Sequence, residues 1–513
     1  MATDVLIAGA GFVGLVLACD LARRGVTLRI VELAAAPPDH RAGSRGKGIQ
    51  PRTLEVYDDL GVIDAVHAAG GPYHPAMAWD GPRQLGPAKF HRIERREPTP
   101  DVPYPSMWML PQPRALEILR ARLGEWGCRV EFGVKVTGFT PDHDGVTASL
   151  EHADGRVERV ATSYLVGADG SRSAVRAAAG IEFVSELVDP HPMITADVVI
   201  PELEPTHWHM WDQAEGGALW LGPLARMPDA FQLYAKFERE APELTLENLR
   251  ALVKQRTGRS ELEVREVYFA SPFGSRSGLA RNFRNGRVFL AGDAAHVHPP
   301  AGGQGMNTAV QDAYNLGWKL GQVIRHGAPD ALLDTYEAER LAVAAGLLEF
   351  VGEMHKDWLG KAKDRDEPRQ GEHRQLSLNY RGGPLSLDER TGVSPGTVRA
   401  GDRAPDAPVI DRAGQATRLF DLYRGPHFTL LALGGTELPQ LDPRFAAPLR
   451  AWRIAQSGAA AGEAALIDRD GHVPRIYGDG LVLVRPDGYV GYAGGRDSAA
   501  SLTNYLGCCF GAA

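Results

Sequence analysis

Cysteine is scarce in this chain of 513 residues. Four cysteines occur, Cys19, Cys128, Cys508 and Cys509, and none of them forms a C-x-x-C pair. Neither a disulfide framework nor a zinc site is therefore indicated, and we predict no metal site. The low cysteine content fits a reducing compartment, so we expect a cytoplasmic protein.

Long apolar runs and an excess of positive charge are also missing. No apolar run is long enough to cross a bilayer, and the N-terminus lacks the basic start and cleavage site of a signal peptide. The 56 basic residues are outnumbered by 64 acidic ones, which argues against nucleic acid and membranes as partners. Hydrophobic content of 44% and charged content of 23% are globular values. The length predicts about two to four domains.

The first motif lies at the N-terminus. A buried-strand pattern at 5–8 runs into Gly-Ala-Gly-Phe-Val-Gly at 9–14, a helical pattern follows, and a second strand ends at Glu32. This is the dinucleotide-binding fingerprint in its strand–turn–helix context. Gly9 makes the turn, Gly11 admits a pyrophosphate, Gly14 lets helix and strand pack, and Glu32 can hold ribose hydroxyls. The expected cofactor-binding residues here are Gly9, Gly11, Phe12, Gly14 and Glu32.

Two further polar features follow in the first 120 residues. The segment 41–55 is basic and Gly-rich before it becomes helical. It is either a solvated loop or cationic support for a diphosphate, for which Arg45 is the best candidate. Gln112 opens a helical pattern, where a helix N-terminus can meet phosphate.

A second strand-to-helix turn lies at 165–176 and contains Asp169-Gly170. Ser171 or Ser173 can cap the helix that follows. As a local signal this is only a turn.

The third motif spans 287–307. Apolar residues at 288–290 predict a buried strand, which ends at Gly292-Asp293. Pro299-Pro300 bars a helix, and Gly302, Gly303 and Gly305 let backbone N–H groups approach a flat or anionic ligand. Helical spacing starts at Met306. The alternative is an ordinary turn between a strand and a helix.

From about 182 to 271 the pattern changes to aromatic strands at 207–211, 218–221 and 231–236. Period two places His207, His209 and Trp211 on one face, and Trp208 and Met210 on the other. The aromatic residues either pack under a sheet or line an apolar pocket for a planar substrate. The candidate substrate contacts are His209, Trp211, Trp220, Tyr234 and Pro299.

The last part of the chain has its own pattern. Residues 361–375 are charge-rich, and we expect them to be exposed. A new unit starts at about 396, with strands at 427–433 and 465–467 and a hairpin at 481–492 that turns at Pro486-Asp487-Gly488. These elements predict a small α/β domain.

The three motifs, in this order, resemble the group A flavoprotein monooxygenases, the aromatic hydroxylase family related to para-hydroxybenzoate and phenol hydroxylases. The resemblance covers the whole chain. The tail from Gly401-Asp402-Arg403-Ala404-Pro405 looks like the thioredoxin-like third domain of the branch that acts on polyketides, phenols and hydroxyphenylpropionate. Because this tail lacks C-x-x-C, we expect its role to be structural or oligomeric. A homodimer is one of the states that the sequence allows.

The resemblance implies non-covalent FAD on the first motif, with Asp293 near the ribityl chain and Arg45 and Gln112 close to the diphosphate or ribityl. It further implies a loop beside the isoalloxazine ring, whose N–H groups stabilise negative charge at N1–C2=O. The residues expected to bind cofactor beyond the first motif are Arg45, Gln112, Asp169, Gly170, Gly292, Asp293, Pro300, Gly302 and Gly303. The expected catalytic positions are Pro299, Gly305, Met306 and Asn307.

The implied reaction is hydroxylation of an electron-rich aromatic, phenolic or polyketide substrate with molecular oxygen, through a flavin C4a-hydroperoxide. No second dinucleotide fingerprint occurs, so NADPH or NADH would bind transiently. The alternatives are a Baeyer–Villiger oxygenase, oxidase or reductase acting on a polyketide, or a non-catalytic flavin- or drug-binding protein.

The expected fold class is mixed, α/β and α+β. We predict a discontinuous Rossmann-like FAD-binding domain at 1–72, 106–181 and 272–395. A β-sheet substrate domain at 73–105 and 182–271 is inserted into it, and a thioredoxin-like domain follows at 396–513.

Overall fold

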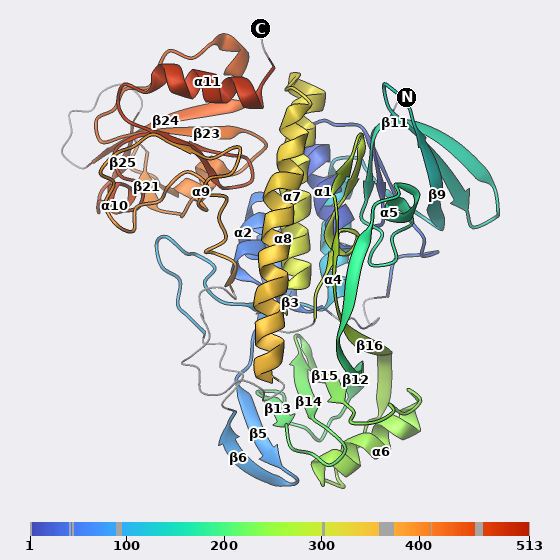
Figure 1. Ribbon diagram of the computed structural model, residues 1–513. Coiled ribbons are helices and arrows are strands. Elements are labelled where there is room, and N and C mark those ends of the chain that lie inside the picture. Colours follow the sequence, from blue (N-terminus) through green and yellow to red (C-terminus); the bar gives the residue numbers. More distant parts are fainter. Residues whose placement is uncertain are drawn as a thin grey trace.

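The computed structural model describes residues 3–39, 43, 46–88, 95–299, 303–358, 374–411, 413–456 and 465–511, with the backbone alone at 351–358 and 465. The expected mixed α/β fold is confirmed, because helices and several sheets alternate along the chain. Two long helices, α7 (Gly305–His326) and α8 (Ala331–Trp358), run side by side through the middle of the molecule (Figure 1).

The first sheet has the order β17-β18-β11-β1-β2-β8. Its central pairs, β1 with β2 and β11, β2 with β8, and β11 with β18, are parallel. Val5, Leu6 and Ile7 are fully buried, as expected for a strand that is covered on both faces. Its strands are β1 Thr3–Ala8, β2 Leu28–Glu32, β8 Val130–Phe132, β9 Val134–Pro141, β10 Val146–His152, β11 Val157–Gly167, β17 Arg284–Asn285 and β18 Val288–Leu290.

Helices cover this sheet and bury its apolar residues in one core. The α1 helix packs against both α7 and α4. Apart from α7 and α8, the helices of this part are α1 Phe12–Arg23, α2 Pro51–Asp59, α3 Ile63–Ala69, α4 Gln112–Glu125 and α5 Ala174–Ala178. A small sheet joins β3 Gly48–Ile49, β7 Trp108–Met109 and β4 Gly71–Pro72.

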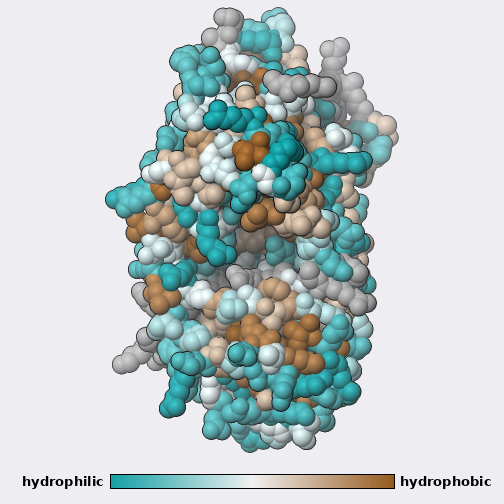
Figure 2. Space-filling model, turned by 90° about the vertical axis from the view of Figure 1, so that its right-hand side faces the viewer, coloured by the Kyte–Doolittle hydropathy of each residue, from teal (hydrophilic) through white to brown (hydrophobic). Residues whose placement is uncertain are grey.

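The second sheet has the order β19-β16-β12-β15-β14-β13-β5-β6 and lies below the first (Figure 1). One of its faces packs on α6 (Leu246–Thr257) through Leu249, Leu252 and Val253. Seen from the side in Figure 2, the surface is hollowed where the upper and lower parts of the molecule meet. Its strands are β5 Ala76–Asp80, β6 Arg83–Pro87, β12 Phe183–Val199, β13 Trp208–Trp211, β14 Leu219–Leu224, β15 Met227–Lys236, β16 Glu266–Ala280 and β19 His296–Val297.

The third sheet belongs to the C-terminal part and has the order β20-β27-β26-β23-β24-β25-β21-β22. It includes β20 (Leu387–Asp388), which precedes the expected boundary at 396. Its other elements are β21 Pro408–Ile410, β22 Ala416–Arg418, α9 Leu419–Tyr423, β23 Phe428–Leu433, β24 Leu449–Gln456, β25 Ala465–Asp468, α10 His472–Tyr477, β26 Gly480–Val484, β27 Val490–Gly494 and α11 Ala499–Cys509. The predicted hairpin is confirmed as β26 and β27.

A buried charge network fixes the C-terminal part to the long helices. Glu339 of α8 accepts from Lys319 of α7 at 2.8 Å and from Arg485 of the β26–β27 turn at 2.6 Å. Asp487 of the same turn pairs with Arg485 at 2.5 Å and accepts from Trp318 at 3.1 Å. All four charged side chains are almost fully buried, so the two parts meet through paired charges.

Candidate active site

The first motif forms a turn whose three glycines have different surroundings. Gly9 has φ +102°, and a Cβ there would lie 2.3 Å from the Ala168 carbonyl oxygen. A Cβ on Gly14 would lie 1.9 Å from the Gly9 carbonyl oxygen, but one on Gly11 would meet no atom within 4 Å. The protein itself therefore requires Gly9 and Gly14, whereas Gly11 borders open space. Phe12, the first residue of α1, is buried in the core.

Glu32 lies at the end of β2, beside this turn. Its carboxylate accepts hydrogen bonds from the Ala10 N–H at 2.8 Å and the Ala34 N–H at 3.0 Å. Both bonds hold the carboxylate at the strand end, where an adenosine ribose meets a dinucleotide-binding fold.

Asp169 and Gly170 follow β11, the neighbour of β1. One Asp169 oxygen accepts from the Ala174 and Val175 N–H groups at 2.8 and 3.2 Å, while the other is buried without a hydrogen-bond partner. Of the two serines considered as caps, Ser173 caps α5, since it accepts from the Arg176 N–H at 2.9 Å. The orphaned carboxylate oxygen leaves an acceptor beside the Gly9 turn.

The third motif follows β18, the other neighbour of β11. Gly292 has φ +64°, and a Cβ there would lie 2.6 Å from Val13 of α1. Asp293 is exposed in the short turn Gly292–Ala294. Since β1, β11 and β18 are parallel neighbours, their carboxyl ends bring all three motifs to one edge of the sheet, where ligands bind in open α/β folds.

A buried polar cluster supports the segment that leads to Pro299. Asp312 of α7 binds His296 at 2.6 Å and Arg340 at 2.7 Å, and His296 lies 2.8 Å from His298. Burial acts to raise the pKa of Asp312, but His296 and Arg340 lower it to about 2. Burial, with His296 beside it, lowers the pKa of His298 to about 3. His298 is therefore neutral at physiological pH.

The third motif ends in α7, which begins at Gly305, so Gly305, Met306 and Asn307 are helical. Pro299 is buried, Gly303 has φ +63°, and Gly305 and Met306 are partly buried. Predicted cofactor contacts at Pro300 and Gly302, like that at Arg45, lie outside the described residues. Gln112 is the first residue of α4 and is partly buried.

Both polar atoms of the Asn307 side chain form hydrogen bonds to backbone groups. Its oxygen accepts from the Gln50 N–H at 2.8 Å, and its nitrogen donates to the Gly48 carbonyl at 2.9 Å and the Gly303 carbonyl at 2.8 Å. Through these bonds the Asn307 side chain joins the start of α7 to β3.

Four of the five candidate substrate contacts lie in the second sheet, and the structure divides them between its two faces. His209 is buried on the α6 side of the second sheet, where its Nδ1 accepts from the Trp79 indole N–H at 3.2 Å and its Nε2–H donates to the Glu204 carbonyl at 2.7 Å. Trp211 belongs to the same core and donates to the Gly81 carbonyl at 2.9 Å. Trp220 pairs across the strands with Met210 and so lies on the opposite face from His209 and Trp211.

The opposite face of the sheet carries the aromatic cluster. Trp208 stacks on Tyr73 at 5.6 Å and on Tyr234 at 6.3 Å, and Trp220 pairs with Tyr234 across the strands. The cluster consists of Tyr73, Met107, Met109, Trp208, Met210, Trp220 and Tyr234. The sequence did not indicate Tyr73, Met107, Met109, Trp208 and Met210 as candidate substrate contacts. The alternation along the strand had, however, placed Trp208 and Met210 on the same face.

The aromatic cluster is connected to the start of α7. Met109 lies in β7, which pairs with Gly48 of β3, the residue that Asn307 holds. Lys47, next to β3, forms a buried ion pair with Asp197 of β12 at 2.7 Å. These contacts join the ring-lined sheet face, the small sheet and the start of α7 into one region. The basic segment at 41–55 was the only sequence signal for Lys47.

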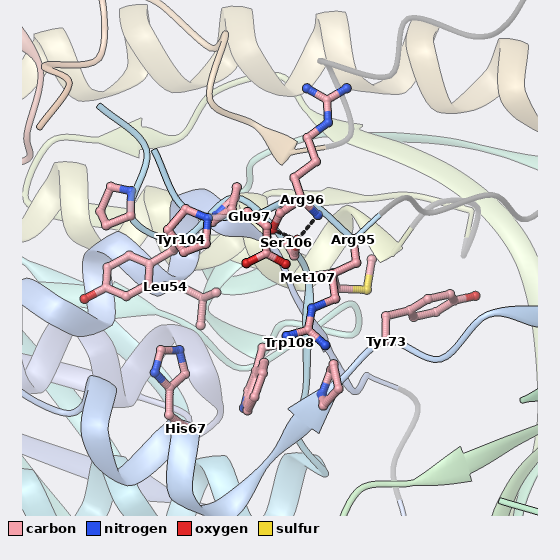
Figure 3. Close-up of a pocket in the computed structure, with 14 residues that line it drawn as sticks. Leu54, His67, Tyr73, Arg95, Arg96, Glu97, Tyr104, Ser106, Met107 and Trp108 are labelled. Atoms are coloured by element: carbon pink, nitrogen blue, oxygen red, sulfur yellow. Dashed lines mark hydrogen bonds between the residues drawn. The ribbon is translucent and has the colours of Figure 1, made fainter. Parts of the chain in front are cut away.

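A pocket of about 150 Å³ opens beside the cluster and shares Tyr73 and Met107 with it. Figure 3 shows His67, Tyr104 and Trp108 on one side and Tyr73 on the other. The His67 ring lies 5.7 Å from Tyr104 and 5.0 Å from Trp108. The volume is below the roughly 300–1,000 Å³ of usual ligand sites, so this pocket alone is too small for a polycyclic molecule.

The described part of the chain offers neither a cluster of metal ligands nor a membrane-spanning helix. No three His, Cys, Asp or Glu side chains gather there in a way that could hold a metal ion. No helix there combines the length and the apolar character that a membrane span needs.

Comparisons with known proteins agree with this geometry. Residues 2–351 match the family model described as FAD binding domain, and residues 397–513 match that of the aromatic-ring hydroxylase C-terminal region. A flavin-dependent monooxygenase of Mycobacteroides abscessus is 40% identical over 98% of this chain and 99% of its own length. A 12-dehydrotetracycline 5-monooxygenase/anhydrotetracycline 6-monooxygenase of Streptomyces rimosus is 34% identical over 100% and 99%.

Among solved structures, aklavinone-11 hydroxylase in complex with FAD and aklavinone superposes with a TM-score of 0.82, at 29% identity and 99% coverage of both chains. The glycine turns at the sheet edge, the matching family models and these relatives identify the same cofactor and reaction class. The chain belongs to the FAD-binding aromatic-ring hydroxylases and is an FAD-dependent aromatic monooxygenase.

Proposed function

We propose that this enzyme hydroxylates an electron-rich phenolic or polycyclic polyketide substrate, with NADPH or NADH as a transient reductant. The observation that carries the proposal is the aromatic face of the second sheet, which is joined through β7 and β3 to the start of α7. We assign substrate binding to residues 73–105 and 182–271, and FAD binding to the three segments around them. The relatives that act on tetracycline intermediates and aklavinone support a polycyclic substrate.

The residues at the sheet edge fit FAD. Open space at Gly11 can admit a diphosphate, and the anchored Glu32 carboxylate can accept from ribose hydroxyls. The free oxygen of Asp169 and the exposed Asp293 are further acceptors on the same edge. Bound FAD would supply the transfer of electrons from the nicotinamide and the activation of oxygen.

This chain's own residues orient the reactants and exclude water. The start of α7 presents backbone N–H groups and the positive end of a helix dipole, which would stabilise negative charge on a bound flavin. The rings of Trp208, Tyr73 and Tyr234 offer flat apolar surfaces to an aromatic substrate. Burial raises the pKa values of Tyr73 and Tyr234, so both remain neutral phenols that can donate hydrogen bonds.

The test is a screen of phenols and polycyclic polyketides for stimulated NADPH and NADH oxidation, with the product mass measured. Hydroxylation adds one oxygen atom to an aromatic carbon, whereas a reductase adds hydrogen and an oxidase removes it. A Baeyer–Villiger product also gains one oxygen but contains a new ester, which NMR distinguishes. A bound aromatic that stimulates no oxidation would favour a binding protein.

Asp293→Ala should weaken the retention of FAD. The exposed carboxylate lies at the carboxyl end of the sheet, where it can accept from ribityl hydroxyls. Loss of such a charge-assisted contact costs about 1.5–3 kcal/mol, or roughly ten- to a hundredfold in affinity. Fluorescence titration of the FAD-free protein measures the dissociation constant, and an unchanged value would refute the role.

Cysteine chemistry should be dispensable. Cys508 is exposed and Cys509 is buried on consecutive positions of α11, and consecutive helical residues do not face each other. Burial raises the pKa of Cys509 to about 12, so its thiol is unreactive at neutral pH. We expect Cys508→Ser/Cys509→Ala to keep substrate-stimulated NADPH oxidation. Loss of that activity with FAD still bound would show a redox role.

A further inference from the structure

We infer that Gln375 is a positioning residue that holds the start of α7 in place and connects it to the C-terminal part of the protein. The inference rests on the proposed function in one respect, namely that the start of α7 lies beside the flavin. The sequence favoured an exposed segment at 361–375, but Gln375 is buried.

The Gln375 side chain reaches both sides of the α7 start. Its nitrogen donates to the Gln304 side-chain oxygen at 2.8 Å and to the Thr308 hydroxyl at 2.9 Å. Its oxygen accepts from the Gln311 side chain at 2.7 Å. Gln304 precedes the first residue of α7, and Thr308 and Gln311 lie on the next two turns. One amide therefore fastens the first turns of the helix.

The same chain of bonds continues into the C-terminal part. The Gln311 oxygen accepts from the Tyr489 hydroxyl at 3.4 Å, and Tyr489 packs on Tyr380 with ring centres 4.5 Å apart. The Tyr380 hydroxyl accepts from Arg340, the partner of Asp312. Gln375 thus lies where the C-terminal hairpin, α7 and the buried polar cluster around Asp312 meet.

The backbone of Gln375 is strained. It has φ +58°, and among the described non-glycine residues only Arg226, with φ +63°, shares this left-handed conformation. A residue other than glycine, asparagine or aspartate persists there only when its surroundings compensate for the cost. The three short bonds of the buried amide provide that compensation. The strained backbone conformation places the Gln375 side chain against α7. Gln375 therefore does more than link α8 to the C-terminal part of the chain.

The test compares Gln375→Ala with Gln375→Gly. Both variants remove the amide, but only glycine relieves the backbone strain. Arg226→Gly is the matched control, since it relieves the same strain in an exposed turn between β14 and β15. The measurements are amide hydrogen exchange at 303–312, in FAD-free and FAD-loaded protein, and the dissociation constant of FAD.

We expect exchange at 303–312 to be at least roughly tenfold faster in both Gln375 variants, because all three hydrogen bonds of the buried amide are lost. FAD binding should weaken by about tenfold in both, while thermal stability should be higher for glycine than for alanine. Arg226→Gly should change neither exchange at 303–312 nor FAD binding. Unchanged exchange in Gln375→Ala, or its return to the wild-type rate in Gln375→Gly, would overturn the inference. Exchange in FAD-free protein can be measured without any enzymatic activity. If Gln375 holds α7 but the start of α7 does not lie beside the flavin, exchange should be faster while FAD binding is unchanged.

Discussion

Gly11→Val should abolish FAD binding and leave the fold intact. A Cβ at Gly11 would meet no protein atom within 4 Å, and its φ of −72° with ψ of −168° is extended backbone that valine adopts readily. Since no described residue lies within 4 Å of that Cβ, we expect the side chain to obstruct a ligand that crosses the turn. We therefore expect FAD affinity to fall by at least about a hundredfold, or about 2.7 kcal/mol. Circular dichroism and FAD titration measure the two effects separately.

Two comparison variants sharpen this experiment. Gly138→Val in β9 also adds its side chain where nothing lies within 4 Å of the Cβ, and it should bind FAD normally. Gly14→Val should instead prevent folding, because its Cβ would lie 1.9 Å from the Gly9 carbonyl oxygen. If Gly11→Val bound FAD like the wild type, the diphosphate would have to lie elsewhere.

Glu339→Gln should destabilise the protein more than any other single charge removal proposed here. The wild-type network contains two buried cations, Lys319 and Arg485, and two buried anions, Glu339 and Asp487. The variant leaves one positive charge unpaired in the interior. Breaking such a buried pair costs about 3–5 kcal/mol, which denaturant unfolding monitored by tryptophan fluorescence can measure.

The pH dependence of this effect has a definite sign. Burial acts to raise the pKa of Glu339, but Arg485 and Lys319 outweigh it and hold the pKa below the usual value of 4.5. The stability that Glu339 contributes is therefore fully present above about pH 4.5, and it is lost as the pH falls below that value. The difference between wild type and variant should thus be large at pH 7 and shrink in acid. Glu349→Gln, an exposed change on the same helix, is the control and should have little effect at any pH.

The sequence by itself determined the cofactor and the reaction class. Gly9, Gly14 and Gly292 are needed because a Cβ would strike the neighbouring chain. The obstructing atoms of Gly9 and Gly292 belong to Ala168 and Val13, which are distant in sequence. Each glycine nevertheless stands between an apolar strand pattern and a helical pattern, and that order can be read along the chain. The strands at 5–8, 28–32 and 288–290 were predictable for the same reason, since a strand covered on both faces is a short run of apolar residues.

Only the tertiary structure decided which face of the second sheet meets the rest of the molecule. Alternation divides Trp208 and Met210 from His209 and Trp211, but it does not tell which set lies against α6. That choice depends on α6 at 246–257 and on Met107 and Met109, which are distant in sequence.

The polar contacts of the α7 start were equally hidden in the sequence. Asn307 bonds to Gly48 and Gln50, more than 250 residues away, and Gln375 lies in a stretch whose charge predicted exposure. A hydrogen bond between distant residues leaves no periodic trace, because each partner is by itself an ordinary polar residue. Its strength comes from burial, and burial is a property of the folded chain alone.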